Sequence, residues 1–208
     1  MFRRTLVLGA LLSLTASGAL AAPFTNGSFE SASVNPGSGW LTLASGSTQI
    51  DGWEVFGGTI DYIGTYWQAA DGNRSVDLNG NGGPSGIRQT FDTTAGTTYL
   101  INFALAGNPD GAPATKTVEV QSGAFSQLFT FTIPAGTTHA NMNWQYHSLL
   151  FTAASGLSTV SFLSLTDSAY FGPALDNVSV AAVPEPATLS LLALGLAGTI
   201  ARRRSIRR

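Results

Sequence analysis

The stretch TTYLINFALAG, residues 97–107, alternates large apolar residues with other residues. Tyr99, Ile101, Phe103 and Leu105 recur at every second position. Because successive side chains of a β-strand point to opposite faces, this period puts all four on one face. We therefore expect a strand with one face on a hydrophobic core.

Similar period-2 runs of β-branched and aromatic residues lie on both sides of this stretch, bounded by Gly, Pro, Asn or Asp. They cover residues 50–56, 59–63, 75–78, 87–91, 115–123, 125–134, 146–152, 157–165 and 174–183. Within them, Trp53 and Phe56 are expected in the core, and Phe125 and Leu157 on inner faces. No part of residues 22–182 keeps a helical period over three turns. About ten strands at this spacing predict an all-β domain, an antiparallel β-sandwich or jelly roll.

The start of the chain has the features of a secretory signal peptide. Arg3 and Arg4 precede an apolar run, and Ala19-Leu20-Ala21 fits the small-residue cleavage pattern. We expect a signal peptide over residues 1–21, cut after Ala21, with a membrane anchor as the alternative. The following residues, 22–182, have a normal length for one domain with its own core.

Charge is unevenly distributed. Residues 22–182 contain three basic residues, Arg74, Arg88 and Lys116, and eleven acidic ones, a net charge of −8. This acidity opposes nucleic-acid binding, because phosphates would be repelled, and it permits bound cations. The chain has no cysteine, which excludes disulfides, thiolate metal sites and a thiol nucleophile.

The C-terminal stretch VPEPATLSLLALGLAGTIARRRSIRR, residues 183–208, has three parts. Pro184-Glu185-Pro186 cannot continue a helix, residues 187–201 carry no charge, and five arginines follow. As a helix, the uncharged part would be about 22 Å long, shorter than a hydrocarbon core of roughly 30 Å. We expect a short hydrophobic helix over residues 187–201 that spans the membrane marginally, with its arginines on the cytoplasmic side.

This tail resembles the PEP-CTERM sorting signal of bacterial exported proteins. The resemblance implies transient anchoring in the inner membrane, cleavage near the Pro184-Glu185-Pro186 motif by an exosortase, and release to the cell surface or extracellular matrix of a Gram-negative-type bacterium. An ordinary single-pass tail anchor is the alternative.

The middle of the chain also has a family resemblance. The segments NGSFE (26–30), DGWEVFGGTIDYIGTYWQAADGNRSVDLNGNGGPSGIRQTF (51–91) and ALDNVSV (174–180) are similar to those of the exported choice-of-anchor C proteins, relatives of the DUF642 domain. The resemblance implies a galactose-binding-like jelly-roll β-sandwich. The wider fold group is mostly carbohydrate-binding and non-catalytic.

The same resemblance implies a structural calcium ion where the first and last strands lie close together. The expected side-chain ligands are Glu30 and Asp176, with a carbonyl from Asn26 or Gly27; two solvated acids are the alternative. Oxygen ligands suit this hard cation. Residues 77–82 imitate an EF-hand loop, but Arg88 stands where the bidentate glutamate belongs, which favours a plain turn.

Aromatic residues concentrate between residues 40 and 67. Sugar rings stack on exposed aromatic faces, while amides and carboxylates bond the hydroxyl groups. The candidate glycan-binding residues are Trp40, Tyr66, Trp67, Gln68, Asp71, Asn73 and Arg74. Packing in a β-core is the alternative for any one of the aromatic residues.

Three functions remain open at this point. The first is a non-catalytic surface or matrix protein that binds exopolysaccharide or an envelope glycan. The second is a structural or adhesive protein that acts by protein–protein contact. The third is a weak hydrolase using a carboxylate pair such as Asp61 with Asp71. The two histidines, His139 and His147, have no third ligand at a metal-like spacing, so zinc is not expected.

Overall fold

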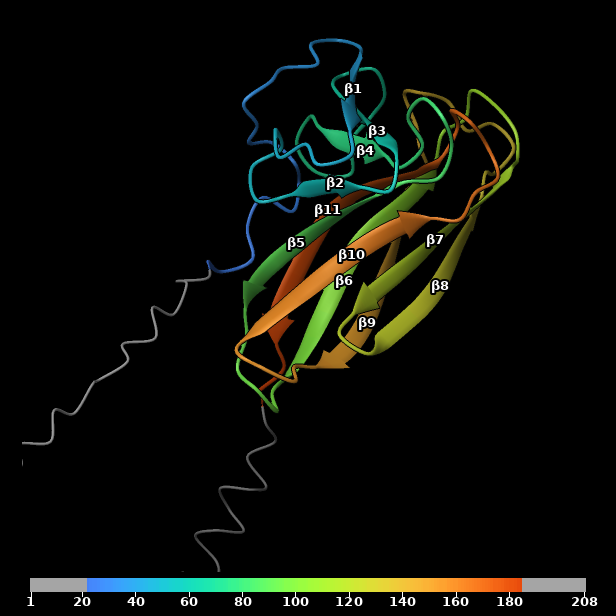
Figure 1. The fold of residues 1–208 in the computed structure, drawn as a ribbon. Helices are drawn as coiled ribbons and strands as arrows, with labels where there is room; N and C mark the ends of the chain where they lie inside the picture. The colour runs from blue at the N-terminus through green and yellow to red at the C-terminus, as the bar shows by residue number, and fades with distance from the viewer. Residues whose placement is uncertain (1–21, 185–208) are drawn as a thin grey trace, which may run out of the picture.

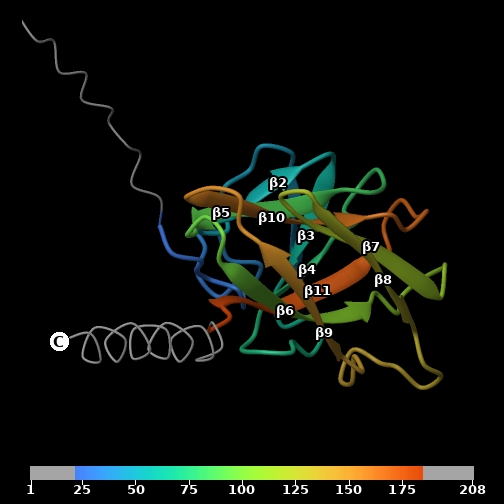
Figure 2. The same ribbon diagram turned by 90° about the horizontal axis from the view of Figure 1, so that it is seen from below.

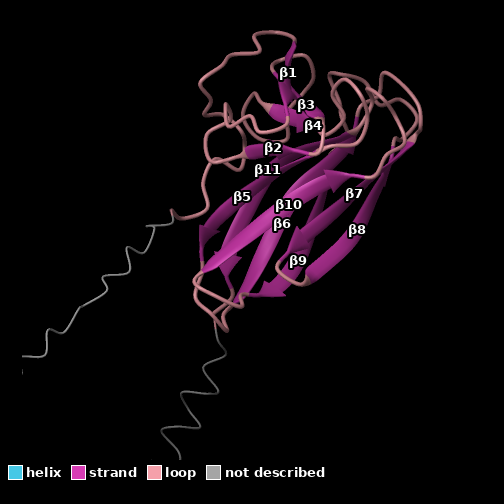
Figure 3. Cartoon of the chain, viewed as in Figure 1, coloured by secondary structure: helices cyan, strands magenta, loops and turns pink. Residues whose placement is uncertain are grey.

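The computed structural model describes residues 22–184, and Figures 1 and 3 show this part as strands joined by loops, without a helix. The strands are β1 (Trp40–Ala44), β2 (Glu54–Phe56), β3 (Thr59–Ile63), β4 (Ser75–Asp77), β5 (Gly86–Asp92), β6 (Thr98–Gly107), β7 (Thr115–Ser122), β8 (Phe125–Thr132), β9 (Gln145–Thr152), β10 (Leu157–Ser164) and β11 (Pro173–Ala182). The all-β prediction is confirmed for this part of the chain.

Several predictions fall outside this range. The signal peptide (1–21), the hydrophobic segment (187–201) and the motif residues Glu185 and Pro186 lie beyond the described residues, while Pro184 is exposed just after β11. Within residues 22–184 there is no helix of the length and hydropathy that a membrane span needs.

The strands form two antiparallel sheets that face each other (Figure 2). One has six strands in the order β1-β3-β4-β11-β6-β9, and the other has five in the order β2-β5-β10-β7-β8. β6 lies between β11 and β9, so the stretch that alternates most regularly in sequence is an interior strand. Its residues Ile101, Phe103 and Leu105 are fully buried, as the period predicted.

The core between the sheets is rich in aromatic rings. Phe103 packs edge-on against Phe129 and Phe162, with ring centroids 5.0 and 5.3 Å apart. Trp53 is buried, as expected. Within residues 22–184 the buried core residues run from Phe29 to Val178 and form one cluster.

Three expected core positions are wrong. Phe56 is only half-buried because it lies on the outer face of β2, opposite to the buried Val55, where the Arg88 guanidinium covers its ring 5.5 Å from the centroid. Phe125 is exposed because it is the first residue of β8 and lies beyond the end of the core. Leu157 is exposed because it lies on the outer face of β10 with Thr159 and Ser161, while Val160 and Phe162 face the core. Strand period gives the face of a residue but not its distance from the middle of the sheet.

The loops meet at the upper end of the sandwich in Figure 1 and are joined to one another. The amide of Gln68 donates to the carbonyl of His139 (2.7 Å), and that of Asn108 donates to the carbonyl of Gly172 (3.0 Å). The first bond joins the loops after β3 and β8, the second joins those after β6 and β10, and His139 Nε2, 2.7 Å from Asp110 Oδ1, connects the two pairs. This end of the fold contains most of the predicted site residues.

Candidate functional site

The loop end encloses an open cavity of about 350 Å³. Strands β1 and β3 contribute to it, as do the loops after β3, β4, β6 and β10. Its lining is Trp40, Asp61, Ile63, Tyr66, Trp67, Asn81, Asn108, Asp110, Tyr170 and Phe171. Aromatic rings, amides and carboxylates therefore converge here from segments far apart in the sequence.

Trp40, the first residue of β1, forms an exposed wall of this cavity. It is 49 % exposed, and its ring centroid lies 4.9 Å from that of Tyr66 at an interplanar angle of 64°. The indole N–H groups of the other three tryptophans donate to protein oxygens, whereas no acceptor within residues 22–184 takes that of Trp40. Trp40 therefore offers a ligand both an aromatic face and a hydrogen-bond donor.

Tyr66 is held in place by two neighbours. Its hydroxyl donates to Asp110 Oδ2 (3.0 Å), and its ring centroid lies 4.4 Å from that of His139. His139 Nε2 lies 2.7 Å from the other oxygen, Asp110 Oδ1. Burial, together with the Asp110 carboxylate, raises the pKa of Tyr66, so its hydroxyl remains a donor.

The position of Trp67 corrects its predicted role. The residue is 3 % exposed and its indole N–H donates to Ser75 Oγ (2.7 Å). Tyr66 and Trp67 lie in the turn that follows β3. Tyr66 points to the outside, and Trp67 packs into the core, where it forms the floor of the cavity and not an exposed stacking face.

A buried polar chain supports the cavity from below. Asp77 on β4 accepts hydrogen bonds from Asn108 Nδ2 (2.7 Å) and from the amides of Asn79 (2.9 Å) and Gly172 (3.0 Å). Asn108 Oδ1 in turn accepts from the amide of Asp110 (2.9 Å). Burial raises the pKa of Asp77 to about 8. The chain links β4 to the loops that carry Asp110 and Phe171.

Lys116, on β7 of the five-stranded sheet, binds the loops that carry Asp110 and Phe171. Its Nζ donates to the carbonyls of Gly111 (2.9 Å) and Phe171 (2.7 Å), and burial lowers its pKa to about 8. The cavity wall at Phe171 is therefore fixed by two hydrogen bonds: Lys116 donates to the Phe171 carbonyl, and the next amide, that of Gly172, donates to Asp77.

Asp61 is the carboxylate on the β-sheet side of the cavity. Its Oδ1 accepts from Thr42 Oγ1 (2.6 Å), and burial raises its pKa. Asp71, its proposed partner in a hydrolase, does not line this cavity. The second carboxylate in the lining is Asp110, which already binds Tyr66 and His139.

The remaining predicted glycan residues lie in the loop between β3 and β4. Gln68 and Asn73 line a separate, shallow hollow with Tyr66 and His139. Arg74 donates to Asn35 Oδ1 (3.0 Å). These residues and Asp71 are thus not gathered with Trp40; Tyr66 and Trp67 are the members that line both hollows.

Glu30 and Asp176 both accept hydrogen bonds from backbone amides of this loop. Glu30 Oε1 accepts from the amides of Asn73 (2.6 Å) and Arg74 (2.7 Å). Asp176 Oδ2 accepts from the amides of Ala70 (2.7 Å) and Asp71 (2.9 Å). The two residues expected as calcium ligands therefore lie at the same loop. Asp176 is fully buried, and this burial raises its pKa to about 7.

The donor set fits a hard cation in part. Two carboxylates flank the loop, and a Cβ at Gly72 would overlap the Glu30 carboxylate, so glycine keeps this space open. Within residues 22–184 no three His, Cys, Asp or Glu side chains form a metal-binding group. A calcium ion here would need backbone carbonyls for its other ligands. The expected carbonyls of Asn26 and Gly27 accept hydrogen bonds from Trp53 Nε1 and the Val178 amide.

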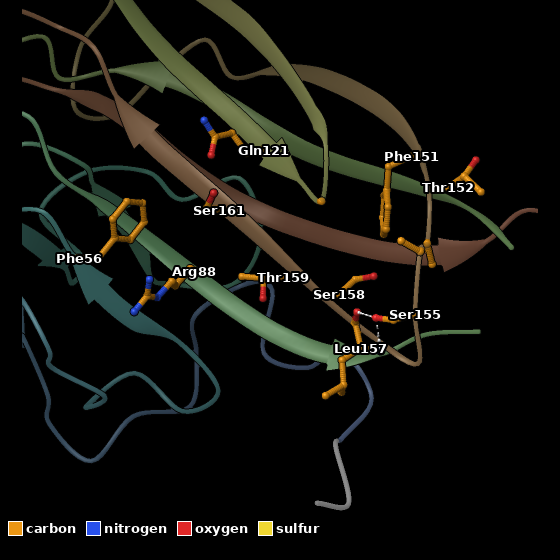
Figure 4. Close-up of a pocket in the computed structure, with 13 residues that line it drawn as sticks. Phe56, Arg88, Gln121, Phe151, Thr152, Ser155, Leu157, Ser158, Thr159 and Ser161 are labelled. Carbon is orange, nitrogen blue, oxygen red and sulfur yellow. Dashed lines mark hydrogen bonds between the residues drawn. The ribbon is translucent and has the colours of Figure 1, made fainter. Parts of the chain in front are cut away.

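A second surface hollow, of about 450 Å³, crosses the outer face of the five-stranded sheet (Figure 4). Hydroxyl-bearing side chains of Ser158, Thr159 and Ser161 line much of it. Its Phe56 ring lies beneath Arg88, which forms a bidentate ion pair with Glu54 (2.7 and 3.0 Å). This hollow therefore offers a ligand no free aromatic face comparable to Trp40.

Sequence reasoning did not name Ile63 of β3 as a lining residue, and it missed all of the lining that comes from the later loops: Asn81, Asn108, Asp110, Tyr170 and Phe171. These residues come from three loops with no shared spacing. The available signal was composition, because Asn79–Asn81 and Asn108–Asp110 are turn segments that carry amide and carboxylate groups.

Two facing antiparallel sheets with a cavity at the loop end define an all-β sandwich of the jelly-roll type. Within this class, the chain belongs to the family described as "Protein of unknown function (DUF642)", whose model matches residues 22–181. A PEP-CTERM protein-sorting motif matches residues 182–207, and a motif of this kind implies sorting by an exosortase. The choice-of-anchor C subgroup stays a prediction.

Among curated proteins, Halomucin of Haloquadratum walsbyi is similar to this chain. It is 31 % identical over 175 residues, which cover 77 % of this chain and 2 % of Halomucin. The chain thus spans a very small part of the length of that relative.

Several solved carbohydrate-binding modules are similar in fold. A family 35 module from Clostridium thermocellum has a TM-score of 0.46 and 14 % identity, covering 69 % of this chain and 99 % of the module. TmCBM61, solved with β-1,4-galactotriose, has a TM-score of 0.46 and 13 % identity, covering 78 % and 99 %. The family 35 module of Cellvibrio japonicus Abf62 has a TM-score of 0.46 and 18 % identity, covering 68 % and 93 %.

Proposed function

We propose that this chain is a non-catalytic surface or matrix protein that binds a glycan, an exopolysaccharide or envelope sugar, in the cavity beside Trp40. The observation that carries the proposal is the exposed Trp40 ring, set against Tyr66 above a cavity lined by amides and carboxylates. A sugar ring presents C–H groups to an aromatic face and hydroxyl groups to its edges. Trp40 meets the first need, and Asp61, Asn81 and Asn108 meet the second.

The support below the cavity holds the binding groups in place before a ligand arrives. Tyr66 is fixed by Asp110 and His139, and Phe171 is held at its carbonyl by Lys116. Fixed groups lose little freedom when a ligand binds, so more of the contact energy appears as affinity.

The test compares variants of the 22–184 fragment in binding to polysaccharide from the producing cells. Trp40→Ala should weaken binding about tenfold or more, because it removes an exposed aromatic anchor. Trp40→Phe should retain part of the affinity. Leu41→Ala is the matched control, because Leu41 is also exposed on β1 but does not line the cavity. Equal binding by Trp40→Ala and the wild type would refute this site.

The same samples distinguish binding from hydrolysis. A binding protein leaves the number of reducing ends in the polysaccharide unchanged during incubation. Release of new reducing ends that depends on Asp61 would instead support the hydrolase alternative.

We also propose that calcium braces the loop of residues 70–74 through Glu30 and Asp176. Both carboxylates already contact this loop, which lies directly beside Tyr66 and Trp67. The ion would stabilise the fold and would take no part in chemistry.

Finally, we propose the export route implied by the sorting motif: removal of residues 1–21, transient anchoring in the inner membrane, and exosortase cleavage near Pro184. The matched motif over residues 182–207 supports it. The mass of protein recovered from the cell surface or medium checks both cleavages; recovery of the uncut chain inside cells would contradict them.

A further inference from the structure

The two sheets end in long edge strands on the same side of the sandwich, β8 and β9 (Figure 1). Each has eight residues, whereas the opposite edges, β2 and β1, have three and five. In the part of the chain that the structure describes, no strand pairs with the outer side of β8 or β9. Their outer backbone N–H and C=O groups are therefore free to pair with another strand.

Neither long edge has the features by which proteins prevent such pairing. No Asp, Glu, Lys or Arg occurs between Val120 and Thr166, and neither strand contains proline. The pairing of β8 with β7 has no register shift. Leu128, in the middle of β8, is 58 % exposed. Charges, prolines and bulges are the usual protections of an edge strand.

The same absence of charge favours a second copy of this chain as the partner. Residues 22–182 have a net charge of −8, so two copies repel each other over most of their surfaces. The β8 edge itself carries no charge; the nearest acidic residue, Glu119, lies one strand away on β7, opposite Leu128, so it does not lie at the free edge.

The hairpin geometry makes the β8 edge self-complementary. The two-residue turn after Ser122, with φ of 59° at Gly123, makes Ser122 and Phe125 a hydrogen-bonded closing pair. Hydrogen-bonded and non-bonded pairs alternate from there, so the amides of Ser126, Leu128 and Thr130 point away from β7. Antiparallel pairing about a two-fold axis then places Leu128 opposite its own copy and Ser126 opposite Thr130.

We propose that β8 is a self-association edge, at which β8 of a second copy pairs antiparallel across a two-fold axis and joins two five-stranded sheets into one. The pairing covers the exposed Leu128 side chains and satisfies the outer backbone groups of both edges. If the protein is a structural or adhesive matrix protein, this β8–β8 pairing is the contact through which its copies associate.

Sedimentation equilibrium of the 22–184 fragment tests the proposal. The wild type should form dimers as its concentration rises. Leu128→Lys should raise the dimer dissociation constant about tenfold or more, because it places two like charges side by side. Leu165→Lys is the matched control: it adds the same charge at a leucine that is 45 % exposed but lies outside the edge strands. Circular dichroism checks that both variants keep the fold.

Cross-linking tests the register. Hydrogen-bonded antiparallel partners have Cα atoms about 5.5 Å apart, within the range of a disulfide. Because the chain has no cysteine, Leu128→Cys should form a covalent dimer on oxidation and Leu165→Cys should not. A wild type that stays monomeric, equal weakening by the two lysine variants, or no cross-link at Leu128→Cys would overturn the proposal. Dimerisation should persist in Trp40→Ala, so this proposal and glycan binding can fail separately.

Discussion

The buried Asp176 carboxyl holds the loop of residues 70–74 through its hydrogen bonds and also has a raised pKa. Its oxygens accept three backbone amides, from Ala70, Asp71 and Asn177, and its pKa is raised from 3.8 to about 7 by burial. Between these two values the folded chain keeps a proton that the unfolded chain has lost. The free energy of unfolding therefore falls as pH rises through this window, and the stabilisation given by the neutral carboxyl is lost above about pH 7.

Calcium should reverse this loss, because it binds the ionised carboxylate. We expect calcium to raise the melting temperature of the 22–184 fragment more at about pH 8 than at about pH 5. Asp176→Asn should remove most of the calcium effect, whereas Asp92→Asn, at an exposed acid on β5, should retain it. Thermal unfolding with calcium or a chelator measures this; an identical melting temperature in both at about pH 8 would refute a calcium site.

At the scale of residues, the sequence located the aromatic cluster but not the orientation of its members. Neither the sequence around Trp40 nor that around Trp67 shows a period that would place the ring, yet Trp40 is exposed and Trp67 is buried. The difference comes from tertiary structure: Trp67 reaches Ser75 across the sheet, while Trp40 stands at the start of an edge strand.

The element that places Asp176 is the last strand, β11. The regular pairing of β11 with β6 is interrupted between Asp176 and Ser179, and Asn177 has a φ of 49°. This bulge shifts the side-chain alternation, which explains why Leu175 and Val178, three positions apart, are both buried. It also turns Asp176 toward the loop of residues 70–74.

The bulge depends on a residue that tolerates positive φ. Asn177→Val should lower the free energy of unfolding by about 1–2 kcal/mol, because a β-branched residue is strained in this conformation. Asn177→Gly should change it little, since glycine adopts positive φ freely. Urea unfolding of the two variants measures the difference, and equal stability of both would show that the bulge is not limited by this backbone angle.

Most strands could be predicted from sequence, because a two-residue period is local information. The expected bounds of 59–63 match β3, and those of 87–91 and 146–152 differ from β5 and β9 by a residue at one or both ends. β1 was missed because only Leu43 of its five residues faces the core, which leaves no period to recognise. The cavity was missed in part because its lining comes from loops that sequence spacing does not connect.

At the scale of the whole molecule, the described part separates three surfaces. The loop end has the aromatic cavity with its carboxylates, the side edge has the uncharged β8 and β9, and the outer face of the five-stranded sheet has the Arg88–Glu54 ion pair. A glycan bound at the loop end therefore leaves the β8 edge free for a second copy. Because the two surfaces are separate, the proposed glycan binding and the proposed pairing with a second copy do not compete for the same residues.

The central claim is that the cavity beside Trp40 binds glycan, and a nuclear magnetic resonance titration tests it most directly. The ¹⁵N-labelled 22–184 fragment has four indole N–H signals, of which Trp40 alone has no protein acceptor within residues 22–184. With oligosaccharides from the polysaccharide of the producing cells, we expect the Trp40 indole signal and the side-chain amides of Asn81 and Asn108 to shift together. Shifts confined to the sheet face around Phe56 and Arg88, or no shifts with calcium present, would contradict the account.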